Sequence, residues 1–315
     1  MSHATRAALR YPWCVRGGIL WLLLATATAT TVAATPRAAH ACSTCSCGDP
    51  TITSMGTEQA YAGRFRLSLG YSHRSDEQGE AFVDDERHVE QRLDVSAAYS
   101  PTRWLQIAAT IPLLERQVTG VDLARDTLRG TGDVDLRTRL TLWRDRGFAP
   151  RHLFGVSAGA TLPTAQTQRD AMGTPLDLDH QLGGLALTPR LGVWYTQLRH
   201  PWSLFASASV AHVMQVEGDE RAGDNLGVTA ALQWQPGESW GVRLAVDGRY
   251  EDRGKRGPML LPDTGGYGQF VSPGVIYSPA MDLVLEAQLQ LPVVDGLYGR
   301  HSESPVLLLA SSYDF

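Results

Sequence analysis

Cysteine is scarce in this 315-residue chain, and apart from Cys14 it is confined to residues 42–47. Beyond residue 41 there is no run of 18 apolar residues, which excludes a membrane-spanning helix from that part. The formal net charge is −5, so the basic excess of nucleic-acid-binding proteins is missing and no nucleic-acid partner is expected. A transmembrane β-barrel stays possible, because alternating lipid-facing and lumen-facing residues cancel in a hydropathy average.

The amino terminus has the pattern of an export signal. A basic start with Arg6, Arg10 and Arg16 precedes a short apolar segment, and Ala39-His40-Ala41 has the small-x-small form of a signal-peptidase site. We therefore expect a signal peptide over 1–41, a Cys-containing periplasmic tail or plug over 42–60, and an outer-membrane barrel over 61–315. An uncleaved transmembrane helix and a lipoprotein anchored at Cys42 are the alternatives.

A period of two runs through the rest of the chain. Phe65, Leu67 and Leu69 alternate with Arg66 and Ser68, which predicts a strand between an apolar and a polar environment. Eleven further segments show comparable alternation: 92–99, 104–113, 133–142, 153–163, 185–197, 202–216, 226–235, 242–250, 267–278, 283–291 and 305–315. The fold class predicted is all-β, an antiparallel up-and-down transmembrane barrel of about 12 strands. A soluble β-sandwich is the alternative, since its strands also alternate.

Connection lengths also alternate, which predicts the orientation in the membrane. Long polar connections are expected at 73–88, 115–131, 164–181, 217–225, 251–266 and 295–304, with short turns between them. Short turns are periplasmic and long loops extracellular in such barrels, so both termini would be periplasmic in a bacterial outer membrane. Aromatic residues flank the short turns, as in an interfacial girdle.

The carboxyl-terminal strand ends with Tyr313 and Phe315 on one face. An aromatic residue two positions before a terminal Phe resembles the membrane insertion signal of outer-membrane barrels. The partners expected are therefore outer-membrane lipid and the barrel-assembly machinery.

Three short motifs resemble one bacterial family. Gly130-Thr-Gly-Asp-Val-Asp-Leu-Arg, Ala160-Thr-Leu-Pro-Thr and Leu289-Gln-Leu-Pro-Val-Val look like segments of the outer-membrane family named for the meta-pathway of phenol degradation. The resemblance covers about residues 60–315. It implies an outer-membrane barrel with a transport role and names no substrate.

Charged residues gather on the face that the alternation assigns to the lumen. These candidate solute-contacting residues are Arg64, Arg66, Arg92, Asp94, Asp133, Asp135, Arg137, Arg139, Arg190, Arg243, Asp247, Arg249 and Glu286. Opposed charges can select solutes in a channel, but the same residues can form an ion-pair lattice that fills a small barrel. The function expected is a channel or transporter for small solutes. The alternative is a structural or partner-docking barrel with a mostly closed lumen.

The thiols Cys42, Cys45 and Cys47 form a second candidate site. C-x-x-C and C-x-C spacings let thiolates converge on a soft ion, so Cu(I) or Zn is a possible cofactor and no other cofactor is expected. In an oxidising compartment a disulfide is the competing interpretation, with one thiol left over for lipidation or for a periplasmic metal or redox protein.

Catalysis is not expected, and no catalytic residue is assigned. Outer-membrane phospholipases also have twelve strands, and His180, His212 and His301 lie in or near long loops, but there is no G-x-S-x-G segment. Two loop groups could instead bind a cation: His88 with 84–86, and His180 with Asp177 and Asp179. Solvated loop charges are the plainer interpretation.

Overall fold

The computed structural model describes residues 62–78, 86–120, 122–169, 172–173, 175–176, 178–215, 220–261, 264–299 and 301–315. None of the helical segments in these ranges is long and apolar enough to cross a membrane. The expected signal peptide and the tail with its three thiols lie outside the described residues.

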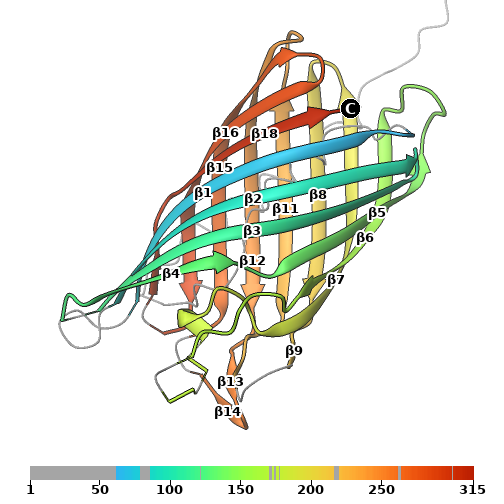
Figure 1. Cartoon of the computed structure of the whole chain (residues 1–315). Helices are drawn as coiled ribbons and strands as arrows, with labels where there is room; N and C mark the ends of the chain where they lie inside the picture. Colours follow the sequence, from blue (N-terminus) through green and yellow to red (C-terminus); the bar gives the residue numbers. More distant parts are fainter. Residues whose placement is uncertain are drawn as a thin grey trace, which may run out of the picture. The chain divides into compact units, whose positions relative to one another are not determined.

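Twelve long strands make up the fold (Figure 1). They are β1 (Phe65–Gln78), β2 (Glu86–Thr102), β3 (Leu105–Thr119), β5 (Val134–Arg144), β6 (His152–Leu162), β7 (Ala186–Arg199), β8 (Trp202–Ala211), β11 (Asn225–Trp234), β12 (Trp240–Glu251), β15 (Gly266–Ala280), β16 (Leu283–Leu297) and β18 (Val306–Asp314). Shorter elements are β4 (Arg125–Thr131), β9 (Met214–Gln215), β10 (Glu220–Arg221), β13 (Lys255–Arg256), β14 (Met259–Leu260), β17 (His301–Glu303) and the 3-10 turn η1 (Leu178–His180).

The long strands pair antiparallel with their neighbours and close on themselves. β1 pairs with β2 on one side and with β18 on the other, so Leu67 lies between Ala97 and Tyr313. Phe315 continues this seam, since its backbone amide donates to the Phe65 carbonyl over 2.8 Å. The prediction of a closed antiparallel barrel of twelve strands is confirmed, with β4 as an extra strand.

Side chains alternate between the wall's two faces with the apolar face outward. Arg66 is 3% exposed, whereas the neighbouring Leu67 is 42% exposed and Leu69 is 51% exposed. A soluble sandwich buries its apolar face, so that alternative is wrong. An outward apolar surface is what a bilayer requires.

Aromatic side chains lie on the outer surface beside the short turns. Trp202 and Trp234 are register partners with ring centroids 6.2 Å apart, and Trp240 is 5.6 Å from Trp234. Tyr277 pairs in register with Trp240 on the next strand. This band is the arrangement that amphipathic rings adopt at a membrane interface.

Several strands run further than the sequence pattern predicts. The segment 115–131, expected to be a loop, is mostly a hairpin in which Thr119 pairs with Arg125. β3 pairs with β5 up to Thr110 and with β4 from Leu113, so β4 and β5 act as one interrupted strand. Parts of 73–88, 251–266 and 295–304 are also paired strand. Their backbones continue the ladder where apolar residues are few and do not alternate regularly, so the period of two does not mark them.

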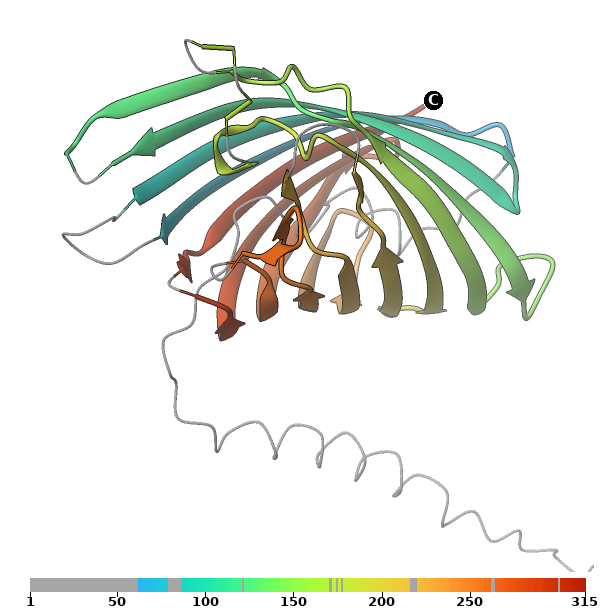
Figure 2. The same cartoon turned by 90° about the horizontal axis from the view of Figure 1, so that it is seen from below.

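The connection between β6 and β7 keeps little regular structure, and it lies at the long-connection end. The hairpin β13–β14 pairs with β10 at the same end of the barrel (Figures 1 and 2). Additional structure is therefore concentrated where the long connections emerge.

Candidate functional site

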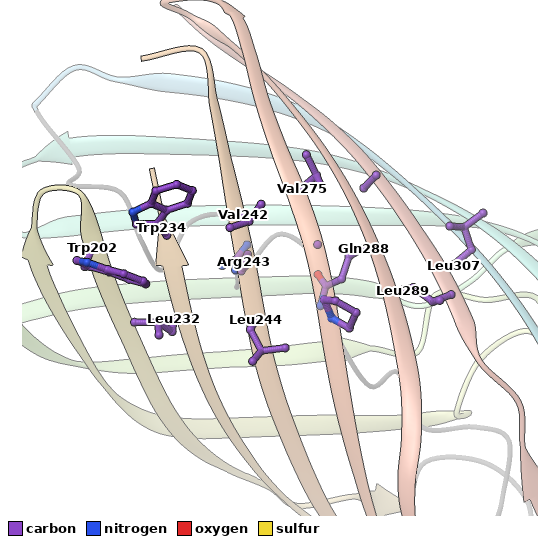
Figure 3. Close-up of a pocket in the computed structure, with 13 residues that line it drawn as sticks. Trp202, Leu232, Trp234, Val242, Arg243, Leu244, Val275, Gln288, Leu289 and Leu307 are labelled. Atoms are coloured by element: carbon purple, nitrogen blue, oxygen red, sulfur yellow. The ribbon is translucent and has the colours of Figure 1, made fainter. Parts of the chain in front are cut away.

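One concavity is a groove of about 640 Å³ on the outer wall (Figure 3). Trp202, Leu244, Val275 and Leu307 line it, and all four side chains face away from the lumen. The surface of this groove is mostly apolar, so it suits lipid chains better than a polar solute.

The second concavity, of about 330 Å³, lies inside the barrel and has the chemistry of a site. Eight of the predicted lumen residues line it: Arg92, Asp94, Asp133, Asp135, Arg137, Arg190, Asp247 and Arg249. They come from β2, β5, β7 and β12 and from the residue just before β5, so the barrel brings together groups that are far apart in the sequence. We call this space the interior cavity.

Several charged residues along the interior cavity are held by ion pairs or by hydrogen bonds. Arg92 Nε lies 2.8 Å from Asp94 Oδ1, and Arg137 pairs with Asp135, which also accepts a 3.0 Å hydrogen bond from Thr161. Each of these arginines pairs with a carboxylate two positions along its own strand, because side chains two apart share a face. Asp247 accepts hydrogen bonds from Thr229 at 2.7 Å and Ser272 at 3.5 Å.

The other five predicted residues lie elsewhere in the interior. Arg64 and Arg66 both bind Asp314 near the short-turn end, at 2.5 and 2.7 Å. Arg243 pairs with Glu286 at 2.7 Å, and both side chains are nearly inaccessible.

The guanidinium of Arg139 stacks on interior aromatic rings. Its centre is 4.2 Å from the Trp194 ring and 5.8 Å from the Phe205 ring. Trp194 and Phe205 belong to a buried apolar cluster with Leu153, Ala231 and Ala245. The part of the interior around Arg139 is therefore apolar. The prediction from charged residues did not anticipate this.

Five charged residues that were expected in loops also line the interior cavity. They are Arg74, Asp76, Arg116, Glu251 and Glu303. Arg116 binds Glu90 at 2.6 Å, and Arg249 pairs with Glu303. Continuing the period-two count past Ser72 would have placed Arg74 and Asp76 inside.

The β6–β7 connection forms part of the cavity lining through residues 181–184. Asp133, predicted as a solute-contacting residue, fixes this connection: its carboxylate accepts hydrogen bonds from the amides of Thr164, Ala165 and Gly184 at 3.0, 2.9 and 2.7 Å. A Cβ at position 183 would lie 2.5 Å from Asp133 Oδ1, so only glycine fits there.

Arg116 is a second anchor for the connection. Its Nη1 donates to the carbonyl of Gln181 at 2.7 Å, and Gln181 is almost completely buried. The connection is therefore attached both to β3 and to the residue just before β5.

The tail thiols and the loop histidines are the remaining residues that the sequence singled out. Cys42, Cys45 and Cys47 lie outside the described residues. Within the ranges that the structure describes, no three or more His, Cys, Asp or Glu side chains are arranged to hold a metal ion. His212 Nδ1 lies 2.7 Å from Asp224 Oδ2, and the His180 and His88 rings lie edge to face with their centroids 6.3 Å apart.

Comparisons with known proteins support the fold. No protein-family model and no curated protein matches the chain. The crystal structure of the COG4313 outer membrane channel from Pseudomonas putida F1 is similar at 14% identity with a TM-score of 0.65, covering 82% of this chain and 97% of that one. The translocator domain of the autotransporter NalP from Neisseria meningitidis is similar at 12% identity with a TM-score of 0.50, covering 84% and 93%. The resemblance to the meta-pathway family stays a prediction, and the chain has the fold of an outer-membrane β-barrel.

Proposed function

We propose that this protein is an outer-membrane channel or transporter for small solutes. The observation that carries the proposal is the interior cavity, a polar space of about 330 Å³ inside a barrel whose outer face is apolar. A protein of similar fold is an outer-membrane channel, which supports the same function.

The cavity chemistry favours small polar or amphipathic solutes. Paired charges of both signs, such as Arg92 with Asp94, present donors and acceptors without a large net field. Such a lining suits a neutral or zwitterionic molecule better than a multiply charged one.

Liposome swelling tests this proposal with a series of solutes. Vesicles that contain the protein should swell faster in small neutral sugars and zwitterionic amino acids than in oligosaccharides. Swelling no faster than that of protein-free vesicles for every solute would reject the proposal.

The alternative is a structural or partner-docking barrel with a mostly closed lumen. The pairing of interior charges favours it, because charges held by one another are less available to a solute. In that case the same vesicles would not swell, although the protein in them would be a folded barrel that resists thermal unfolding.

We further propose the orientation and the partners expected from the sequence. The termini and short turns would face the periplasm, and the partners would be outer-membrane lipid and the barrel-assembly machinery. No nucleic-acid partner and no enzymatic activity are proposed.

The thiol tail would form a soft-metal or redox site, with Cu(I) or Zn as the ion and a periplasmic metal or redox protein as a partner. Mass spectrometry of the protein from its native membrane tests this. A Cys42–Cys45 disulfide without metal would defeat the metal proposal, and a lipid adduct on Cys42 would replace it with an anchor.

A further inference from the structure

Two histidines that are 92 residues apart in the sequence meet at the long-connection end of the barrel. His88 is on β2, and His180 is the last residue of η1 in the β6–β7 connection. Their ring centroids are 6.3 Å apart with an interplanar angle of 70°. The structure therefore places one histidine from each of the two suggested cation sites side by side.

The His88 side chain is buried without hydrogen bonds. Only 3% of it is exposed, and neither Nδ1 nor Nε2 has a hydrogen-bond partner. Nε2 lies 3.4 Å from Glu86 Oε2, an ion-pair distance without hydrogen-bond geometry. A buried imidazole whose Nδ1 has no hydrogen-bond partner and whose Nε2 has only a long contact with a carboxylate is unusual and needs a physical reason.

Carboxylates supply negative charge on the same side of the barrel. Asp76 pairs in register with His88 from the neighbouring strand β1, and its side chain is 2% exposed. One of its oxygens binds Arg74 at 3.0 Å, and Oδ1 has no hydrogen-bond partner. On the other side His88 pairs in register with Val118 of β3, which is apolar.

We propose that His88 and His180, with Glu86, bind one first-row transition-metal ion such as Zn²⁺. Imidazole nitrogen and carboxylate oxygen are the ligand types that such ions prefer at non-thiol sites. No three such groups in the described residues are arranged to hold an ion, so small rotations of the His88, His180 and Glu86 side chains would bring their ligand atoms to one point, and water would complete the coordination. The site is independent of the thiol tail and of whether the lumen conducts.

A metal at this position would bridge two elements. β2 is part of the barrel wall, whereas η1 belongs to the connection whose residues 181–184 line the interior cavity. Binding would hold the connection against the wall and make it more resistant to proteases.

Isothermal titration with Zn²⁺ tests the site. The protein would be purified in detergent with Cys42, Cys45 and Cys47 replaced by serine, so that thiolates cannot bind the ion. We expect one Zn²⁺ per chain and at least a tenfold loss of affinity in His88→Ala and in His180→Ala. His212→Ala is the matched control, because His212 also lies near the long-connection end of the barrel and has a carboxylate partner. The Zn²⁺ affinity of this variant should be unchanged.

A second measurement separates metal binding from misfolding. Electron paramagnetic resonance of the Cu²⁺-loaded protein should show two nitrogen ligands, reduced to one in either single variant, while circular dichroism stays that of an intact barrel. The proposal is overturned if the thiol-free protein binds no ion. It is equally overturned if the His88 and His180 variants bind as tightly as their parent, or if His212→Ala loses as much affinity as they do.

Discussion

At the level of single residues, neighbouring positions in β5 meet opposite environments. Leu136 is 42% exposed on the outer face, whereas Arg137 lines the interior cavity and pairs with Asp135. Leu136→Arg should cost about 2–4 kcal/mol of membrane stability if the residue lies near the bilayer midplane. Folding into lipid vesicles, followed by urea titration, measures this cost.

The paired control is Arg137→Leu, which changes the inner face and leaves the lipid-facing surface as it is. We expect its barrel to assemble in the membrane far better than that of Leu136→Arg. Equal loss of assembly in the two variants would contradict the inward and outward assignments.

The ionised carboxylate of Asp224 should stabilise the fold at neutral pH and lose this effect in acid. Burial, the largest single influence, would raise its pKa, but hydrogen bonds from the Val213 amide, His212 and Arg221 together lower it below the ordinary 3.8. Because the folded pKa is the lower one, the stabilisation is complete above the unfolded value and is lost as the pH falls through the folded value.

Hydrogen exchange at the Val213 amide, corrected for its intrinsic rate, should therefore show protection that is constant above the ordinary carboxyl pKa of 3.8 and is lost as the pH falls below that value. Asp224→Asn removes the titrating charge and should make protection independent of pH over this range. A pH dependence that survives in Asp224→Asn would show that another group is responsible.

At the level of elements, Asp133 holds the β6–β7 connection through three backbone amides. Asp133→Ala should free this connection, so limited proteolysis should cut between residues 163 and 185 several-fold faster while the barrel stays folded. Asp133→Asn keeps an acceptor oxygen and should give an intermediate rate. Unchanged cleavage in Asp133→Ala would contradict the anchoring role.

The strands of the membrane region could be predicted from the sequence, because a residue such as Leu67 and its neighbour Arg66 have opposite polarity. Strand ends could not be predicted in the same way. The hairpin joining β3 to β4 is held by backbone pairing between residues of similar polarity, such as Thr119 and Arg125. Hydrophobic alternation carries no information about such residues.

The candidate site was only partly predictable for a related reason. The inward direction of the charged residues on β5 and β12 can be predicted from the alternation of side chains along a strand. The position of the β6–β7 connection depends instead on tertiary contacts. The bond from Arg116 to the Gln181 carbonyl joins residues 65 positions apart, and no local pattern marks it. The stacking of Arg139 on Trp194 likewise requires knowing which strands face each other across the interior.

At the level of the whole molecule, orientation is testable by labelling. Cysteine replacing Met259 would stand on an exposed hairpin at the long-connection end, and cysteine replacing Met281 on an exposed short turn. Gly223, between β10 and β11, is unsuitable for such a replacement, because a Cβ there would lie 1.8 Å from the Asp252 carbonyl oxygen.

In a chain whose tail cysteines are replaced by serine, an impermeant maleimide added to intact cells should label position 259 and spare position 281. After the outer membrane is permeabilised, both positions should react. The reverse pattern in intact cells would contradict the proposed orientation.

Single-channel recording in planar bilayers tests the central claim most directly. If the interior cavity is part of a solute pathway, the purified protein should give steady single-channel conductance. Arg137→Leu should shift its ion selectivity toward cations, because Asp135 loses its guanidinium partner. A folded, membrane-inserted barrel that shows no conductance above that of the bare bilayer would contradict the account.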